Sequence, residues 1–284
     1  MQDKTTILLT GGTGFVGSRF IEKFKDDYEI VCITRGGSSG GAQSFKGYFG
    51  SFEDLRQLDN IKMDAVVHLA AVTGGCLERD GIIVNCEGTR CLMRYAAEHG
   101  CRRFVLASSI AIVGSENKDF VPTQLPMTED EPCVDKHGYG FSKHLMEEVS
   151  HYHSRQFPEN IIFNLRLGGL KPSGADITPR EPGPPSNWWF TTLGQLSVHD
   201  AIDAIRLSLD SGLGPGVHTY WIAPPKAPTL TPVHELVEQA FGPDAVDLSH
   251  YKQPGHELDP IYSIEKARRE LGWEPKDLPD WMEE

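Results

Sequence analysis

Thr10-Gly11-Gly12-Thr13-Gly14-Phe15-Val16-Gly17 is the stretch of this sequence that decides the fold. It follows a short apolar run over residues 6–10 and opens a helical pattern over residues 15–25. Glycines spaced by three leave room for a phosphate group at the helix N-terminus, where free N–H groups and the helix dipole attract anions. A glycine-rich loop alone is a weak signal, but its strand–loop–helix setting favours phosphate binding over an ordinary tight turn.

The rest of the first 166 residues alternates short apolar runs with helical patterns. We predict strands over residues 6–10, 29–34, 64–70, 103–108 and 161–166, and helices over 15–25, 53–58, 86–99 and 139–155. Strands that are apolar throughout are buried on both faces, and their alternation with helices is typical of parallel sheets. The sequence therefore predicts an α/β fold with a doubly wound parallel sheet, the Rossmann arrangement.

This alternation breaks after Arg166. Residues 171–186 contain five prolines and are expected to form a loop. Further regular elements are predicted over residues 199–209, 217–222, 232–241 and 263–271. We therefore predict a dinucleotide-binding domain over residues 1–168, joined again by about 196–222, and a small C-terminal substrate-binding lobe formed by residues 169–195 and 223–284.

Charge and composition exclude several classes of partner. The chain has 27 Lys and Arg against 40 Asp and Glu, a net charge of -13, which repels nucleic acids and anionic membranes. No apolar run approaches the roughly 20 residues that span a bilayer, and Met1–Lys4 leads directly into a strand pattern, so we expect no signal peptide. The six cysteines form no Cys-x-x-Cys pair, which favours free thiols, no metal site and a cytoplasmic location.

A tyrosine and a lysine four residues apart carry the candidate chemistry. Tyr139 and Lys143 begin a predicted helix, where this spacing puts both on one face. A cation beside the phenol favours its ionised form, so Tyr139 could exchange a proton with an alcohol or ketone near neutral pH. Ser109 closes the preceding strand, at the edge where open α/β sheets bind ligands, and could hydrogen-bond the reacting oxygen.

Each of these residues also has a structural explanation. Ser109 could be only a strand-end cap, and Tyr-x-x-x-Lys recurs at Tyr262–Lys266, where we expect a surface pair on a C-terminal helix. The order of glycine loop, serine and Tyr139–Lys143 favours catalysis for the first copy. At the end of the second strand stands Arg35 instead of the acid that usually holds a ribose hydroxyl. Arg35 could pair with a 2′-phosphate and so favours NADP over NAD, unless it is only a solvated surface arginine.

Taken together, these motifs resemble the extended short-chain dehydrogenase/reductases, the NAD-dependent epimerase/dehydratase family. The matching pieces include the loop at 10–17, His68-Leu-Ala-Ala71, Asn85 with Gly88-Thr89, Ser108-Ser109, Tyr139 to Lys143, Arg166, Val198-His199-Asp200, and residues 259–275. The resemblance spans nearly the whole chain, and the ordered set is more specific than any one motif.

The resemblance implies roles for these positions. Ser109, Tyr139 and Lys143 would be catalytic. The cofactor, NADP or NAD, would contact Tyr139 and Lys143 as well as Gly11, Thr13, Gly14, Phe15, Val16, Gly17, Arg35, Ser51, Phe52, Leu69, Ala70, Ala71 and Asn85. The helices around residues 86–99 and 139–155 would pair into a homodimer, and the substrate would be a small carbohydrate-like molecule.

Departures from the family pattern argue against some of the reactions that family members catalyse. Ser51 stands where related proteins often carry an acid that contacts adenine. Ile110 and Ala111 replace the acids that dehydratases use to move protons, so dehydratase activity is not expected. The segment between Arg166 and Val198 is shorter than in nucleotide-sugar 4-epimerases, and residues 188–190 (Trp-Trp-Phe) could close a compact pocket or simply pack in the small lobe.

Three functions are compatible with the sequence. The first is an NAD(P)-dependent oxidoreductase acting on a hydroxyl or keto group of a sugar or sugar nucleotide. The second is a nucleotide-sugar epimerase that keeps its NAD bound and returns the hydride to the opposite face; the short segment before Val198 counts against it. The third is a non-catalytic dinucleotide sensor, which the retained Ser109, Tyr139 and Lys143 disfavour.

Overall fold

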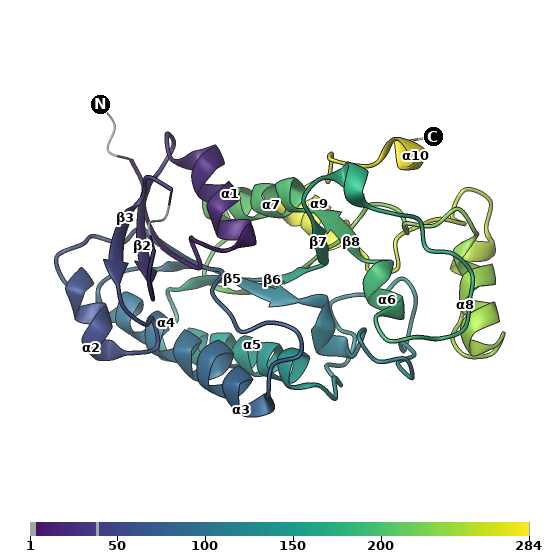
Figure 1. The fold of residues 1–284 in the computed structure, drawn as a ribbon, viewed down its shortest axis with the longest axis horizontal. Helices are drawn as coiled ribbons and strands as arrows, with labels where there is room; N and C mark the ends of the chain where they lie inside the picture. Colours follow the sequence, from purple (N-terminus) through teal and green to yellow (C-terminus); the bar gives the residue numbers. More distant parts are fainter. Residues whose placement is uncertain (1–3, 38–39, 284) are drawn as a thin grey trace. The chain divides into compact units, whose positions relative to one another are not determined.

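A seven-stranded sheet organises the chain (Figure 1). The structure is a computed structural model that describes residues 4–37 and 40–283. The strands of this sheet, in spatial order, are β3 (Gln43–Lys46), β2 (Glu29–Thr34), β1 (Thr6–Thr10), β4 (Ala65–His68), β5 (Arg103–Ser109), β6 (Ile161–Leu167) and β9 (Gly216–Ile222). A separate pair consists of β7 (Gly169–Lys171) and β8 (Gln195–Ser197). The expectation that the chain has no signal peptide rested partly on Met1–Asp3, which lie outside the described residues.

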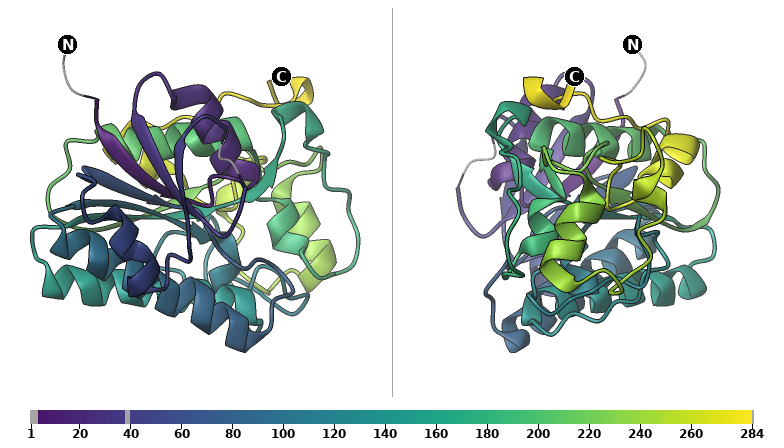
Figure 2. Two further views of the ribbon diagram at one scale, coloured as in Figure 1. Left: turned by 60° about the vertical axis from the view of Figure 1, so that its left-hand side comes forward. Right: turned by 90° about the vertical axis from the view of Figure 1, so that its right-hand side faces the viewer.

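The central strands pair in parallel and are buried. Leu9 of β1 faces Cys32 of β2 on one side and Val67 of β4 on the other. Every residue of β1 and β4 is buried, as expected for strands covered on both faces. The helices α4 and α5 lie side by side on the face of the sheet opposite α1 (Figures 1 and 2). The predicted doubly wound Rossmann fold is therefore confirmed.

The helices follow the predicted order, with differences at their ends and with two short additions, at residues 189–192 and 280–283, that were not predicted. They are α1 (Phe15–Phe24), α2 (Phe52–Leu55), α3 (Glu78–Gly81), α4 (Gly88–Glu98), α5 (Gly138–Gln156), α6 (Trp189–Thr192), α7 (Val198–Asp210), α8 (Val233–Phe241), α9 (Glu265–Leu271) and α10 (Asp280–Glu283). Within the described residues, no helix combines the length and the apolar character needed to cross a bilayer.

The helix predicted to start at Cys86 begins eight residues earlier. It consists of α3, a π-helical segment (Ile82–Glu87) and α4 in unbroken succession. The sequence pattern missed this start because a π-helix does not keep the 3.6-residue spacing of apolar side chains on which the prediction relied. The π-helical segment carries Asn85, whose side chain is buried.

The chain divides into two compact units. The first comprises residues 1–108, 142–165 and 205–219, and the second comprises 109–141, 166–204 and 220–284. Leu8, Val66, Leu92, Phe104 and Met146 belong to the buried core of the first unit. Units defined by packing do not test the domain bounds inferred from the sequence, which remain a prediction.

The second unit has an aromatic core. Trp189 and Phe190 are fully buried there and contact each other and Phe241, with ring centroids 4.7–5.4 Å apart. Of the three aromatic residues considered for closing a substrate pocket, these two instead pack inside the unit. Only Trp188 is exposed, at 45%, with a left-handed φ of 70° that is uncommon for a bulky residue.

Candidate active site

The glycine loop between β1 and α1 owes two of its glycines to close packing. A Cβ at Gly17 would lie 2.2 Å from the carbonyl oxygen of Gly11, and a Cβ at Gly11 would lie 2.7 Å from the amide nitrogen of Ala70. Gly11 also has a φ of +74°, which favours glycine. Gly11 and Gly17 therefore allow the loop to fold back on itself and against the end of β4, a reason that sequence analysis did not give.

The tip of this loop is open to solvent. Thr13, Gly14 and Phe15 are exposed, and α1 has no side-chain cap at its N-terminus. The first helical hydrogen bond runs from the amide of Ser18 to the carbonyl of Gly14 at 3.0 Å. The amides of residues 15–17 thus precede the first helical bond, at the end of the helix where the dipole favours an anion. This geometry fits the pyrophosphate of a dinucleotide.

A buried hydrogen-bonded chain supports the carboxyl ends of β1 and β4. Thr10 Oγ1 lies 2.6 Å from His68 Nδ1, and His68 Nε2 lies 2.9 Å from Thr89 Oγ1. Thr89 in turn donates to the carbonyl oxygen of Asn85 at 2.6 Å. Burial, together with the positive charge of Lys143, lowers the pKa of His68 to about 3. His68 is therefore neutral at physiological pH and acts as a hydrogen-bonding link.

Asn85 fixes the backbone that follows β4. Its side chain accepts from the amide of Val72 and donates to the carbonyl of Val72, both at 2.9 Å. The same amide group donates to the hydroxyl of Ser142 on α5 at 2.9 Å. Asn85 thus ties the segment after β4, which contains Leu69, Ala70 and Ala71, to helix α5. This arrangement gives Asn85 a supporting role, and its predicted contact with a cofactor remains a prediction.

The residues predicted to contact the adenosine end lie at the start of α2 and after β2. Ser51 caps α2, because its hydroxyl accepts from the amide of Asp54 at 3.2 Å. Phe52 is 39% exposed, and Arg35 is exposed directly after β2. The cap gives Ser51 a structural role, and its contact with a cofactor remains a prediction, as do those of Phe52 and Arg35.

Lys143 lies buried at the carboxyl end of β5. Its ammonium donates to the carbonyl oxygen of Ala107 at 2.6 Å, two residues before Ser109. One turn further along α5, Glu147 accepts a hydrogen bond of 2.5 Å from Ser108. Burial lowers the pKa of Lys143 to about 8, and the negative charge of Glu147 opposes this shift. Glu147 was not among the predicted site residues, although its position four residues after Lys143 on one helix could have revealed it.

Glu147→Gln is expected to move the alkaline limb of the activity profile to lower pH. Lys143 is charged below its folded pKa of about 8 and loses its charge as pH rises through that value. Removing the carboxylate removes the interaction that opposes the shift, so the limb should fall by roughly one pH unit. The profile of kcat/KM between neutral and alkaline pH measures this shift.

Glu148→Gln is the matched control, because Glu148 is the exposed neighbour on the same helix. Glutamine at position 147 keeps an oxygen that can accept from Ser108, so the packing of β5 against α5 should survive. An alkaline limb that stays in place in Glu147→Gln would show that Glu147 does not tune Lys143.

Ser109 and Tyr139 belong to the second unit. Ser109 ends β5, and its hydroxyl accepts from the amide of Ala111 at 3.1 Å, so the strand-end cap considered from the sequence is present. A hydroxyl has one donor and two acceptor positions, so a cap of this kind leaves its proton for another oxygen. Half-buried Tyr139 stands in the first turn of α5. Its neighbour Gly140 packs so closely on Ala111 that a Cβ would lie 2.5 Å from the Ala111 carbonyl oxygen.

The second Tyr-x-x-x-Lys copy is not the surface pair that we expected. Tyr262 is fully buried, precedes α9, and donates to the carbonyl oxygen of Phe190 at 3.4 Å. Burial raises its pKa well above the ordinary value. The alternation of the preceding segment was too weak to reveal that this residue belongs to the core. Tyr262 is therefore a packing residue.

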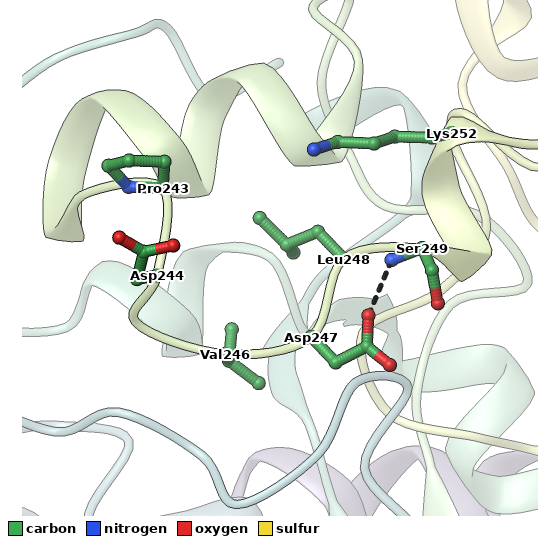
Figure 3. Close-up of a pocket in the computed structure, with 7 residues that line it drawn as sticks. All are labelled: Pro243, Asp244, Val246, Asp247, Leu248, Ser249 and Lys252. Carbon is green, nitrogen blue, oxygen red and sulfur yellow. Dashed lines mark hydrogen bonds between the residues drawn. The ribbon is translucent and has the colours of Figure 1, made fainter.

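A pocket of about 390 Å³ follows α8 and contains none of the predicted site residues (Figure 3). Its only interaction between the drawn residues runs from the amide of Ser249 to the carboxylate of Asp247 at 2.9 Å. The lining residues are Pro243, Asp244, Val246, Asp247, Leu248, Ser249 and Lys252. Ser109, Tyr139 and Lys143, the predicted catalytic residues, do not line this pocket.

Comparison with known families identifies the family of the chain. The family model described as "NAD dependent epimerase/dehydratase family" matches residues 7–170, more than half of the chain. The chain belongs to this family. The matched range contains the glycine loop, the Asn85 segment, Ser109, Tyr139 and Lys143. The predictions of family and of an enzyme of this family are confirmed.

Known proteins similar to the chain include nucleotide-sugar enzymes. UDP-glucose 4-epimerase GEPI48 of Cyamopsis tetragonoloba is 26% identical over 326 aligned positions, covering 95% of this chain and 91% of the relative. A short-chain dehydrogenase/reductase superfamily protein from Agrobacterium tumefaciens, solved with bound NAD, has a TM-score of 0.69 at 22% identity, with coverages of 95% and 92%. UDP-glucose 4-epimerase from Bifidobacterium longum, solved with NAD+ and UDP, has a TM-score of 0.70 at 19% identity, with coverages of 96% and 94%.

Proposed function

We propose that the chain is an NAD(P)-dependent enzyme that inverts a hydroxyl-bearing carbon of a nucleotide sugar. The observation that carries this proposal is the ordered set of glycine loop, Ser109, Tyr139 and Lys143 in a chain similar to a UDP-glucose 4-epimerase over 95% of its length. We therefore favour an epimerase over a net oxidoreductase, whereas the sequence alone favoured the oxidoreductase.

Three side chains supply the acid–base chemistry in this proposal. Tyr139 takes the proton from the substrate hydroxyl and returns it to the oxygen of the resulting carbonyl group. The ammonium of Lys143, held at the Ala107 carbonyl, favours the ionised phenol. Ser109 donates its hydroxyl proton to the reacting oxygen and so orients it. The family's cofactor, when bound, supplies a nicotinamide that accepts and gives back the hydride.

Apart from Tyr139, the residues that would hold this cofactor belong to the first unit. The amides of residues 15–17 would bind the pyrophosphate, and the segment 69–71 would pass along the dinucleotide. Arg35, exposed after β2, would pair with a 2′-phosphate, so we propose a modest preference for NADP. The alternative is NAD, which is bound in solved structures of similar fold.

A net oxidoreductase is the second candidate, favoured by the compactness of the chain. The alignment with the Cyamopsis tetragonoloba epimerase extends over 326 positions, whereas this chain has 284 residues, so the relative contains insertions that this chain lacks. A shorter substrate-binding region suits a smaller sugar or sugar acid. In that case the reduced cofactor would leave the enzyme after each turnover.

An assay that follows both the sugar and the cofactor separates these candidates. Purified chain is incubated with NAD or NADP and with UDP-glucose, UDP-galactose, UDP-glucuronic acid or the free sugars. We expect interconversion of UDP-sugar epimers without net reduced cofactor, which chromatography and absorbance would measure. Stoichiometric reduced cofactor would favour the oxidoreductase, and cofactor binding without turnover of any substrate would overturn both candidates and revive a dinucleotide sensor.

Two further features remain proposals. A homodimer formed through α4 and α5 follows from the family resemblance, and analytical ultracentrifugation of the purified chain tests it. A cytoplasmic location is inferred from the cysteine usage, because the six cysteines form no Cys-x-x-Cys pair in the sequence.

A further inference from the structure

Two histidines and one aspartate lie close together in the C-terminal part of the second unit. His250 Nε2 is 2.7 Å and His256 Nδ1 is 2.8 Å from the same carboxylate oxygen, Oδ2 of Asp259. The three ligand-type atoms all lie within 4.8 Å of one another. None of these residues takes part in the proposed reaction.

We propose that His250, His256 and Asp259 bind a divalent transition-metal ion of the Zn²⁺ type. Two imidazole nitrogens and one carboxylate oxygen are a ligand set that Zn²⁺ uses in proteins, with a fourth position left for water. Mg²⁺ and Ca²⁺ fit less well because they prefer sites made entirely of oxygen ligands. The prediction of no metal site rested on the spacing of the cysteines alone. It did not consider ligand sets made of histidine and aspartate.

The backbone that carries the three ligands is held in place. Fully buried Tyr251 follows His250 and donates its hydroxyl to the carbonyl of Pro260 at 3.0 Å. The turn before Asp259 receives hydrogen bonds from the amide of Ala227 to the carbonyl of Leu258 and from the amide of Val233 to the carbonyl of Glu257, both at 2.8 Å. The three side chains would therefore adjust to an ion by rotating on a fixed backbone.

The distances leave such an adjustment within reach. Zn²⁺ bonds of about 2.0–2.1 Å in a tetrahedron separate neighbouring ligand atoms by roughly 3.3 Å. The two contacts to Asp259 must therefore lengthen by about half an ångström. The side chains of His250, His256 and Asp259 are 34%, 46% and 32% exposed, so they can rotate and an ion can enter from solvent.

The surroundings suit a cation with an open coordination position. The cluster lines a pocket of about 420 Å³ together with polar Thr128 and Ser263, which leaves room for water. Arg268 also lines this pocket, but its charge is shared by Glu265 and Glu274, each at 2.6 Å. Lys252, two residues after His250, pairs with Glu238 at 2.7 Å. The nearby cations are thus matched by carboxylates.

A bound ion would serve as a clip within the second unit. It would join the segment at His250 to the turn at Asp259, which leads into the buried residues Ile261 and Tyr262. The amide of Met127 donates to the carbonyl of Ile261 at 2.7 Å, so the clip would also steady the loop around Met127. Because an ion that binds only the folded chain stabilises it, the expected effect is on stability rather than on turnover.

Zn²⁺ titration of the full chain, without an added histidine tag, tests the proposal. We expect one Zn²⁺ per chain by calorimetry and a rise in Tm of roughly 5 °C at a hundredfold excess over Kd. His256→Gln and Asp259→Asn should each weaken binding by about tenfold or more, whereas the control His151→Gln, at an exposed histidine of α5, should bind as the parent does.

Co²⁺ bound to the unmodified chain gives a readout that does not depend on any variant folding. Ligands from histidine and aspartate should give d–d absorption bands without the thiolate charge-transfer band that cysteine ligands produce. A thiolate band, no stoichiometric binding, or undiminished binding in folded His256→Gln and Asp259→Asn would overturn the proposal.

Discussion

Tyr139→Phe is expected to lower kcat by roughly 10²–10⁴-fold, the usual contribution of a positioned acid–base group. The substitution removes only the hydroxyl, so the ring of this half-buried residue should keep its packing in the first turn of α5. NAD or NADP affinity should change little, because the amides of residues 15–17, which we propose bind the phosphates, lie on a different helix. Steady-state kinetics and cofactor titration measure the two effects separately.

Tyr152→Phe is the matched control for this prediction. Tyr152 is on the same helix and is 43% exposed, so loss of its hydroxyl should leave kcat unchanged. Full turnover in Tyr139→Phe would remove the central residue of the proposed mechanism. A loss of turnover accompanied by an equal loss of folded protein would instead make Tyr139 a structural residue.

The strands and the glycine loop could be predicted because their determinants are local. Buried parallel strands such as β1 and β4 are apolar throughout, and the loop before α1 must contain glycine wherever the chain packs on itself. The reason for Gly11 could not be predicted, since it depends on the backbone that follows β4, about sixty residues away. All three glycines were predicted to contact the ligand, and the structure adds a packing role for Gly11 and Gly17.

The charge environment of Lys143 depends on contacts that no local pattern encodes. Its depressed pKa arises from burial at the end of β5, and the opposing charge of Glu147 is itself held by Ser108. Likewise, His68 links Thr10 and Thr89 because both converge on it from separate elements, and it is neutral because it is buried near the positive charge of Lys143. The sequence motifs indicated which segments form the candidate site. The hydrogen-bond and charge partners of each side chain can be identified only from the folded structure.

The roles of the aromatic residues at 188–190 also could not be predicted from the sequence. Trp189 and Phe190 are equally compatible with a substrate-stacking surface and with a core when only their neighbours in sequence are known. Their burial against Phe241 of α8 decides for the core. Trp188 remains the exposed member of the three, because its left-handed backbone turns the chain between it and Trp189.

Gly17→Ala is expected to cost about 1–3 kcal/mol in the free energy of unfolding, the usual price of overpacking, and to weaken cofactor binding at least tenfold. The added Cβ would lie 2.2 Å from the carbonyl oxygen of Gly11 and 2.8 Å from the Gly12 Cα, so the loop must open. Alanine ordinarily stabilises a helix relative to glycine by up to about 1 kcal/mol, so a loss of stability would oppose intrinsic propensity and identify the collision as the cause.

The control for this collision is Gly183→Ala, where an added Cβ meets no atom within 4 Å. Denaturant unfolding and calorimetric titration with NAD and NADP compare the two variants at a temperature where both are folded. If Gly17→Ala matched the parent in both measurements, the loop would have to tolerate a side chain at its tightest point. The proposed fit of a dinucleotide to the N-terminus of α1 would then lose its basis, because the positions of the amides proposed to bind phosphate depend on that close packing.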